Sequence, residues 1–109
     1  MADHDVLGGF EHQVLIALIR LGGEAYSVPI VLEIETVTGR SVAPAAVYVT
    51  LRRLEKRGLL ESRTAPLESG ELGRPRRVFS LTAMGLEVLR EARRTLSSLW
   101  DGVAALEDV

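Results

Sequence analysis

The fold of this chain is decided by residues 44–82, PAAVYVTLRRLEKRGLLESRTAPLESGELGRPRRVFSLT. The first part predicts a helix from Pro44 to a stop at Gly58, because proline suits the first helical position and glycine ends helices. Two strands are predicted next, Leu59–Ala65 and Arg76–Leu81, joined by a tip at residues 66–75. A helix followed by a two-stranded hairpin is typical of a winged helix-turn-helix, which docks a helix in the major groove of DNA.

The predicted helix has two different faces. Val47, Leu51 and Leu54 recur at helical spacing and should face the core. The other face combines small residues, which allow close approach to base edges, with arginines, which suit phosphates. The alternative is a solvated basic helix that carries a half-buried tyrosine. We predict that the residues of this helix that contact DNA are Pro44, Ala45, Ala46, Tyr48, Val49, Thr50, Arg52 and Arg53.

A cluster of arginines closes the tip of the predicted hairpin. Arg74, Arg76 and Arg77 lie where a wing would meet the DNA backbone, so we predict that they bind phosphate. Glu68 and Glu71 lie inside the tip and would repel phosphate, which assigns the contact to the arginines. The alternative interpretation is that the arginines only protect an exposed strand edge.

The charge of the chain is unevenly distributed. The net charge is −2, which on its own argues against a nucleic-acid partner. Residues 44–77 nevertheless contain eight Arg or Lys and four Asp or Glu, so this segment carries +4 and the remainder −6. Phosphate binding requires local positive charge on one face, and the net charge of the whole chain is a poor measure of it.

Two more helices are predicted before the decisive stretch. One runs from about Gly8 to Leu21 and has almost no polar face, so it should be buried on most sides. The next is predicted to be capped by Ser27 and closed by Gly39. Its apolar stripe consists of Ile30, Val31, Ile34 and Val37.

The last predicted helix is long and carries a heptad seam. It is capped by Thr82 and runs from Ala83 to about Leu106, with apolar or small residues at alternating steps of four and three from Gly85 onward. Such a seam exceeds what a three-helix head can cover, which favours a homodimer. The predicted dimer interface is Leu89, Ala92, Leu96, Leu99, Trp100, Val103 and Leu106.

These elements predict an α+β fold that is mainly α, a winged helix-turn-helix with a long C-terminal dimerisation helix. With 109 residues the chain has the size of one domain. We expect residues 1–82 to form the head, with a disordered tail at 1–7, and residues 83–109 to form a dimerisation helix that packs with it.

Several classes of function are disfavoured. The chain has no cysteine, so disulfides and thiolate metal sites are excluded, and His12 stands alone on its helix. We find no catalytic constellation and predict no enzyme activity, no cofactor and no metal site. The N-terminus is acidic and no apolar run of about 18 residues occurs, so neither a secretory signal nor a membrane span is predicted. We expect a cytoplasmic protein.

The chain resembles the PadR family of bacterial transcriptional regulators. The resemblance covers roughly residues 7–101 and rests on five segments in the order and spacing of that family. The segments are Gly9–Glu11 leading into Val14–Leu15, Leu21–Tyr26, Val47–Leu60, Gly73–Phe79 and Leu81–Gly85. Three positions depart from the family pattern: Ala43 where Ser is common, Ser27 where Gly is common, and Val49 where Pro is frequent.

This resemblance implies a dimeric winged-helix repressor whose last helix is exchanged between protomers. A single C-terminal helix places the chain with the short branch of the family, some members of which bind flat apolar drugs between paired C-terminal helices. By the same resemblance, a possible effector pocket consists of Phe10, Gln13, Val14, Leu96 and Trp100. The alternative is that Trp100 only packs in the dimer seam, because large aromatic residues dominate interfaces.

The sequence therefore predicts a sequence-specific DNA-binding transcriptional regulator. We expect a homodimeric repressor that binds double-stranded DNA at a near-palindromic operator and is released by a small hydrophobic effector. The alternative hypothesis is a winged-helix module that binds another protein and not DNA, because a fold does not determine a function. Arginines on both the helix and the wing favour DNA.

Overall fold

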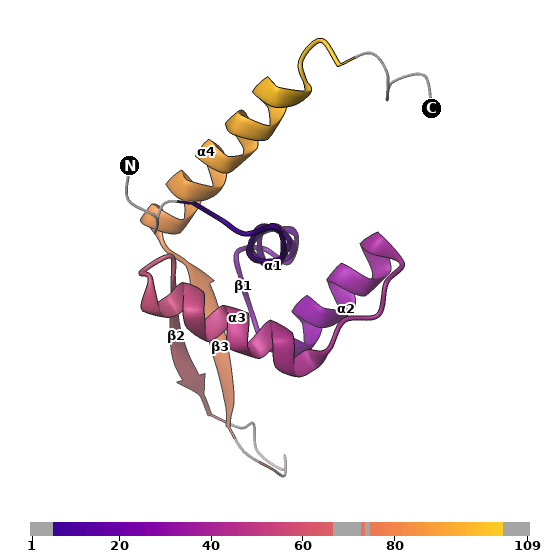
Figure 1. Ribbon diagram of the computed structural model, residues 1–109. Helices are drawn as coiled ribbons and strands as arrows, with labels where there is room; N and C mark the ends of the chain where they lie inside the picture. The colour runs from indigo at the N-terminus through magenta and orange to yellow at the C-terminus, as the bar shows by residue number, and fades with distance from the viewer. Residues whose placement is uncertain (1–5, 67–72, 74, 104–109) are drawn as a thin grey trace.

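The computed structural model describes residues 6–66, 73 and 75–103. In chain order the elements are α1 (Gly9–Arg20), β1 (Glu24–Ala25), α2 (Ser27–Thr38), α3 (Pro44–Lys56), β2 (Leu60–Ala65), β3 (Arg76–Leu81) and α4 (Ala83–Trp100) (Figure 1). The strands form an antiparallel sheet in the order β1-β3-β2. This arrangement confirms the predicted mainly helical winged helix-turn-helix.

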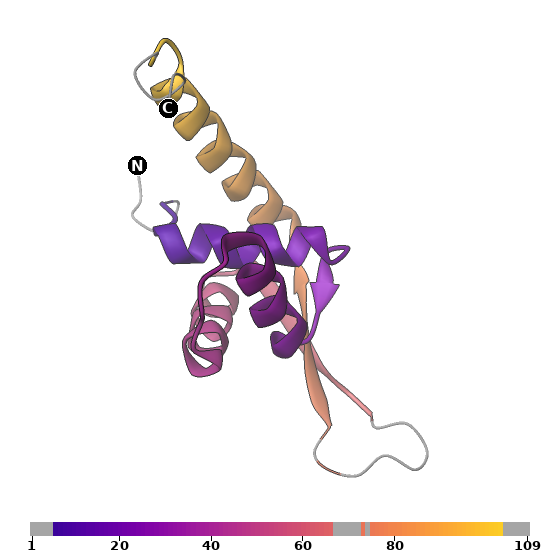
Figure 2. The ribbon, with the colours of Figure 1, turned by 90° about the vertical axis from the view of Figure 1, so that its right-hand side faces the viewer.

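The elements separate into two ends of the molecule. Helix α1 lies across the middle, with α2 and α3 on one side of it and α4 on the other (Figure 2). The β2-β3 hairpin extends past α3 in the direction opposite to α4, as both views show (Figures 1 and 2). Helix α3 and the β2-β3 hairpin therefore share one end, and α4 projects from the other.

A single core holds the helices on the sheet. Helix α3 contributes its predicted inward stripe, α1 contributes one buried face, and β3 contributes Phe79, the largest fully buried side chain. Thr50 corrects the prediction for α3, because its side chain is only 5% exposed and therefore faces the core. The fully buried members of this core include Val14, Leu15, Leu18, Ile30, Val47, Leu51, Leu54, Leu59 and Phe79.

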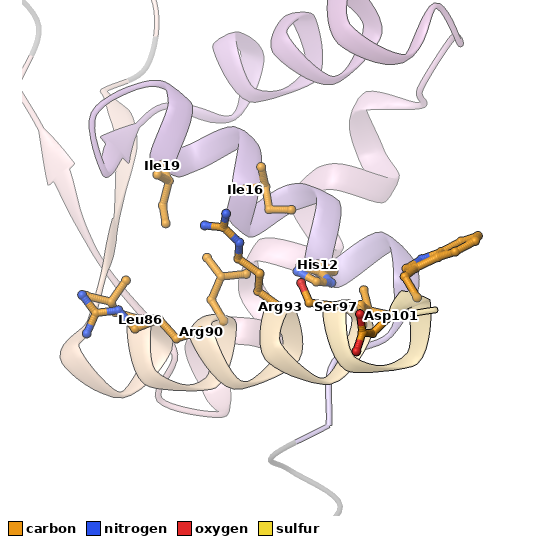
Figure 3. Close-up of a pocket in the computed structure, with 11 residues that line it drawn as sticks. His12, Ile16, Ile19, Leu86, Arg90, Arg93, Ser97 and Asp101 are labelled. Atoms are coloured by element: carbon orange, nitrogen blue, oxygen red, sulfur yellow. The ribbon is translucent and has the colours of Figure 1, made fainter. Parts of the chain in front are cut away.

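The first two helices differ from their predicted details. Helix α1 is not buried on most sides, because Ile16 and Ile19 are exposed on the side that faces α4 (Figure 3). Ser27 is the first residue of α2, not its cap; Tyr26 occupies the cap position and makes no side-chain capping bond. Val37 is exposed and does not belong to the buried stripe. Gly39 does close the helix, as predicted, with a left-handed φ of 72°.

The sheet contains one strand that the sequence did not reveal. Strand β1 has two residues and pairs with β3, with Glu24 opposite Ser80 and Ala25 opposite Phe79. Strand β3 is therefore central and is covered on one edge near its C-terminal end. Leu59 does not belong to β2, but its carbonyl accepts a hydrogen bond from the Thr82 N–H at 3.2 Å.

The start of α4 is fixed to the head by a cap and by a close contact. Thr82 Oγ1 accepts from the Gly85 N–H at 3.0 Å and donates to the Gly58 carbonyl at 2.8 Å, which confirms the predicted cap. A Cβ on Gly85 would lie 2.1 Å from the Leu59 carbonyl oxygen, so only glycine fits at this crossing.

The end of α4 comes earlier than predicted. The helix stops at Trp100, and Gly102 follows with a left-handed φ of 77° that ends helical geometry. Val103 consequently lies beyond the helix, and Leu106 lies outside the described residues. At the other terminus, residues 1–5 of the expected disordered tail are also outside the description, whereas Leu7 packs on the core.

Candidate nucleic-acid interface

Helix α3 presents most of the predicted DNA-contacting residues to solvent. The predicted contact residues that are exposed are Pro44, Ala45, Ala46, Tyr48, Val49, Arg52 and Arg53. Thr50 is the exception noted above. Ala43 occupies the helix cap and makes no side-chain capping bond, so the front of α3 consists of small side chains around Pro44. This surface can approach base edges closely, and the guanidinium groups of Arg52 and Arg53 follow the small residues about two helical turns later.

The wing holds its two described arginines in place through different contacts. The Arg76 guanidinium lies 5.2 Å from the centroid of the Tyr26 ring, a distance suited to a cation–π interaction. Arg77 is half-buried, and its Nη1 donates to Ser62 Oγ at 3.0 Å. Arg74, Glu68 and Glu71 lie outside the described residues.

One groove joins the helix to the wing. Tyr48 of α3 and Arg76 and Arg77 of β3 line it together, opposite the first residues of α2, and its volume is about 370 Å³. Tyr48 is held by an edge-to-face contact with Phe79, whose ring centroid is 6.0 Å away at an interplanar angle of 81°. The structure therefore brings together residues that the sequence separates by 28 positions. Tyr26 was missed as a member of this surface, because no local pattern marks a residue that supports an arginine 50 positions away.

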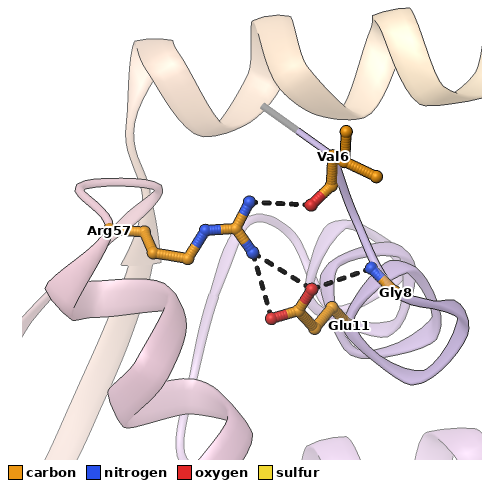
Figure 4. A network of polar contacts seen from close by, with 4 residues as sticks. All are labelled: Val6, Gly8, Glu11 and Arg57. Carbon is orange, nitrogen blue, oxygen red and sulfur yellow. Dashed lines mark hydrogen bonds and ion pairs between the residues drawn. The ribbon is translucent and has the colours of Figure 1, made fainter. Parts of the chain in front are cut away.

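Two of the eight basic residues counted in the positive segment pair with acidic side chains of other elements. Arg57 forms an ion pair with Glu11, with Nη1 3.0 Å from both carboxylate oxygens, and donates from Nη2 to the Val6 carbonyl at 2.9 Å (Figure 4). Glu11 also accepts from the Gly8 N–H at 2.8 Å. Arg63 pairs with Glu24. The first contact fastens the end of α3 to the start of α1.

A second candidate site is a largely apolar groove of about 750 Å³ between α1 and α4. His12, Ile16 and Ile19 of α1 face Arg90 and Arg93 of α4 across it (Figure 3). His12 was predicted only as a polar surface residue. The full lining is His12, Ile16, Ile19, Leu86, Leu89, Arg90, Arg93, Leu96, Ser97, Trp100 and Asp101.

The predicted effector pocket is divided by the structure. Leu96 and Trp100 line the α1–α4 groove. Phe10 and Gln13 line a different groove, beside the loop between α2 and α3, and Val14 is fully buried in the core. The reason is the helical period, since residues 12, 16 and 19 share the side of α1 that faces α4, whereas residue 14 faces inward.

The predicted dimer seam also has two parts. Leu89 is buried against the head of its own chain, and Ala92 is half-buried. Leu96, Leu99 and Trp100 are 46%, 69% and 52% exposed. The second half of α4 therefore carries large apolar side chains that the described part of the chain covers only in part.

Other kinds of site find no support in the described residues. Across residues 6–66, 73 and 75–103, no three His, Cys, Asp or Glu side chains gather in a way that would hold a metal ion. Within the same ranges, no helix is both long and apolar enough to cross a membrane.

Comparison with known proteins decides the family. Residues 14–91 match the family described as the transcriptional regulator PadR-like family. The chain belongs to this family. Its members are transcriptional regulators of the DNA-binding winged-helix class and not enzymes.

Individual relatives agree with this assignment. The chain is 43% identical over 61 residues to the transcriptional regulator Rv3488 of Mycobacterium tuberculosis (strain ATCC 25618 / H37Rv), covering 56% of this chain. It spans about half of that relative, 53% of its length. A PadR family transcriptional regulator from Eggerthella lenta DSM 2243 is 32% identical, with a TM-score of 0.68 over 88% of this chain and 81% of that one.

A more distant structure shares the fold alone. The protein F93 from STIV, a winged-helix DNA-binding protein, is 15% identical and has a TM-score of 0.72 over 89% of this chain and 97% of its own. This likeness supports the winged-helix architecture of the chain and nothing further.

Proposed function

We propose that this PadR-family protein is a homodimeric repressor that binds a near-palindromic operator. Its α3 would enter the major groove while the wing binds the flanking phosphates. The observation that carries the proposal is the groove in which Tyr48 of the recognition helix meets Arg76 and Arg77 of the wing. Small residues that allow close approach to base edges, beside arginines on both α3 and the wing that suit phosphates, support duplex DNA as the partner.

The second half of α4 supports the dimer. Leu96, Leu99 and Trp100 form an exposed apolar surface at the end of the molecule opposite α3. A second copy that packs on this surface would cover it and leave both recognition helices free. Two-fold pairing of the heads then predicts two half-sites separated by about one helical turn of DNA or a multiple of it.

The α1–α4 groove supports control by a small hydrophobic effector. Five of its lining residues are aliphatic, and Trp100 adds an aromatic ring to its wall. A ligand that binds better to a dimer with differently spaced heads would shift the population toward that dimer and release the operator.

Equilibrium binding to DNA tests the proposed repressor. The probe is a fluorescent duplex from the region upstream of the protein's own gene, compared with a scrambled duplex between about 50 and 200 mM salt, where phosphate-dominated binding falls steeply. We expect tight binding to the upstream duplex, with one dimer per site. Binding to neither duplex would contradict DNA recognition by the unliganded protein and favour the protein-interaction alternative.

Substitution of Arg53 and Arg77 tests whether these arginines contact DNA phosphates. Arg53→Ala and Arg77→Ala should each weaken binding to every duplex and reduce the salt slope by about one unit per lost phosphate contact. Arg94→Ala removes an equally charged side chain from the far end, on α4, and should leave the slope unchanged. An unchanged slope in both test variants would remove these residues from the interface.

A further inference from the structure

A continuous chain of polar contacts links the recognition helix to the wing. Arg52 Nη1 lies 3.1 Å from Glu55 Oε1 on α3. The other oxygen of the same carboxylate, Glu55 Oε2, accepts from Ser62 Oγ of β2 at 2.5 Å. Ser62 Oγ in turn accepts from Arg77 Nη1 of β3 at 3.0 Å. This series of contacts therefore passes through α3, β2 and β3, and an arginine of the candidate DNA surface stands at each of its ends.

The chemistry of each member fits its place. A serine hydroxyl has one proton to donate and lone pairs to accept, so Ser62 can give its proton to the carboxylate and receive the Arg77 N–H at once. Glu55 uses one oxygen for each neighbour, and its side chain is 27% exposed. The contacts from Ser62 to Glu55 and from Arg77 to Ser62 are both partly buried, which strengthens them relative to contacts in water.

The two arginines are held to different degrees. Arg52 pairs with Glu55 three residues along the same helix and is about half exposed, a kind of ion pair that contributes little and that a phosphate displaces easily. Arg77 instead donates to a neutral hydroxyl. It keeps its full charge, and a guanidinium has five N–H donors, so several remain for a phosphate.

We propose that Ser62 and Glu55 are positioning residues for DNA binding. They hold Arg77 of the wing at a fixed place relative to α3, so that helix and wing meet the duplex as one preformed surface. Holding a long side chain in advance removes part of the entropy that binding would otherwise cost. This inference rests on the proposed DNA binding and adds to it two residues that do not touch DNA themselves.

Ser62→Ala is the decisive variant, because it leaves the charge of the protein unchanged. Binding to the upstream duplex should weaken about three- to tenfold, the effect of one partly buried hydrogen bond, with no change in the salt slope, since no phosphate contact is lost. Arg77→Ala should weaken binding and lower the slope. The double variant should bind no more weakly than Arg77→Ala, because Ser62 acts through Arg77.

Two further variants separate positioning from a general effect on folding. Ser62→Thr keeps a hydroxyl on a strand, where threonine is well tolerated, and should restore binding to within about twofold of the wild type. Glu61→Gln changes an exposed residue next to Ser62 on the opposite face of β2 and controls for any change near the hairpin. Thermal unfolding of each variant reports whether the head stays folded.

The outcomes are distinct. A loss of affinity in Ser62→Ala that disappears in the Arg77→Ala background, with rescue by threonine, is the expected result. Wild-type affinity in Ser62→Ala, or losses that add in the double variant, would overturn the positioning role while leaving the proposed function intact. A wild-type protein that binds neither duplex would overturn both.

Discussion

The two halves of α4 carry one continuous heptad pattern but have different surroundings. In the first half, Gly85 and Leu89 are buried against the head of their own chain. In the second half, Leu96 and Leu99 occupy the same kind of seam position and are exposed. A heptad repeat therefore identifies a surface that will be covered, but it does not say by what. Here the first half stabilises the fold, and we propose that the second half stabilises the dimer.

The largest expected effect is that of Gly85→Ala, which tests the buried half. The new Cβ would lie 2.1 Å from the Leu59 carbonyl oxygen and 2.9 Å from Leu81 Cδ1, so α4 must move away from the head. Overpacking against backbone should lower the free energy of unfolding by about 3 kcal/mol, although alanine is the better helix former. Urea unfolding at a fixed protein concentration measures this loss.

Gly9→Ala is the matched control, because nothing lies within 4 Å of a Cβ built at that helical glycine. Its free energy of unfolding should stay within about 0.5 kcal/mol of the wild type or rise. Equal effects at the two glycines would show that the crossing of α4 over Leu59 is not tight.

A smaller effect is expected for Thr82→Ala, at the start of the same buried half. The substitution removes the hydrogen bond from the Gly85 N–H and the one to the Gly58 carbonyl. Loss of a capping side chain should lower the free energy of unfolding by about 1 kcal/mol, measured by urea unfolding. Thr82→Ser keeps the hydroxyl and should restore most of the stability; equal losses in both variants would assign the effect to the threonine methyl group.

The smallest effect on the fold, and a large one on association, is expected for Leu99→Asp in the exposed half. Leu99 is 69% exposed, so a cooperative unfolding transition of the head should persist. A charge in an apolar interface should raise the dissociation constant of the dimer at least about tenfold, which sedimentation velocity measures.

Ser98→Asp introduces the same charge one residue away and off the seam, so it should remain dimeric. If Leu99→Asp also stays dimeric, the copies associate through another surface. If the head loses its cooperative transition, the two halves of α4 are not independent, and the comparison drawn above is wrong.

The elements with strong local signals could be predicted from the sequence. Pro44 and Gly58 mark the two ends of α3, and β3 runs from Arg76 to Leu81 as expected. The end of α4 was also marked, since Gly102 adopts the left-handed conformation that ends helices, but the heptad pattern extended the prediction past it. Thr50 lies three residues after Val47 and four before Leu54, so the same helical period that gave the buried stripe includes it.

The site could be predicted only in part, because most of its geometry depends on strand register. Arg53, Arg76 and Tyr48 were predicted as DNA contacts from their chemistry and their place on a helix or a hairpin, and the structure leaves all three exposed. The contact of Ser62 with Arg77 joins residues that are not directly opposite in the register, where Ser62 faces Phe79. Strand β1 is too short to show any periodicity. The ion pair between Arg57 and Glu11 could not be predicted either, because it depends on how α1 packs against α3.

The position of Trp100 has a spectroscopic consequence. It is the only tryptophan in the sequence, and it lies at the end of α4 on the wall of the α1–α4 groove. All tryptophan emission from the unlabelled protein therefore originates at the end of the molecule opposite the recognition helix. The emission wavelength reports how exposed Trp100 is to water, so its burial by a second copy or by a ligand shifts the emission to the blue. Labelled DNA reports DNA binding at the other end of the molecule in the same sample.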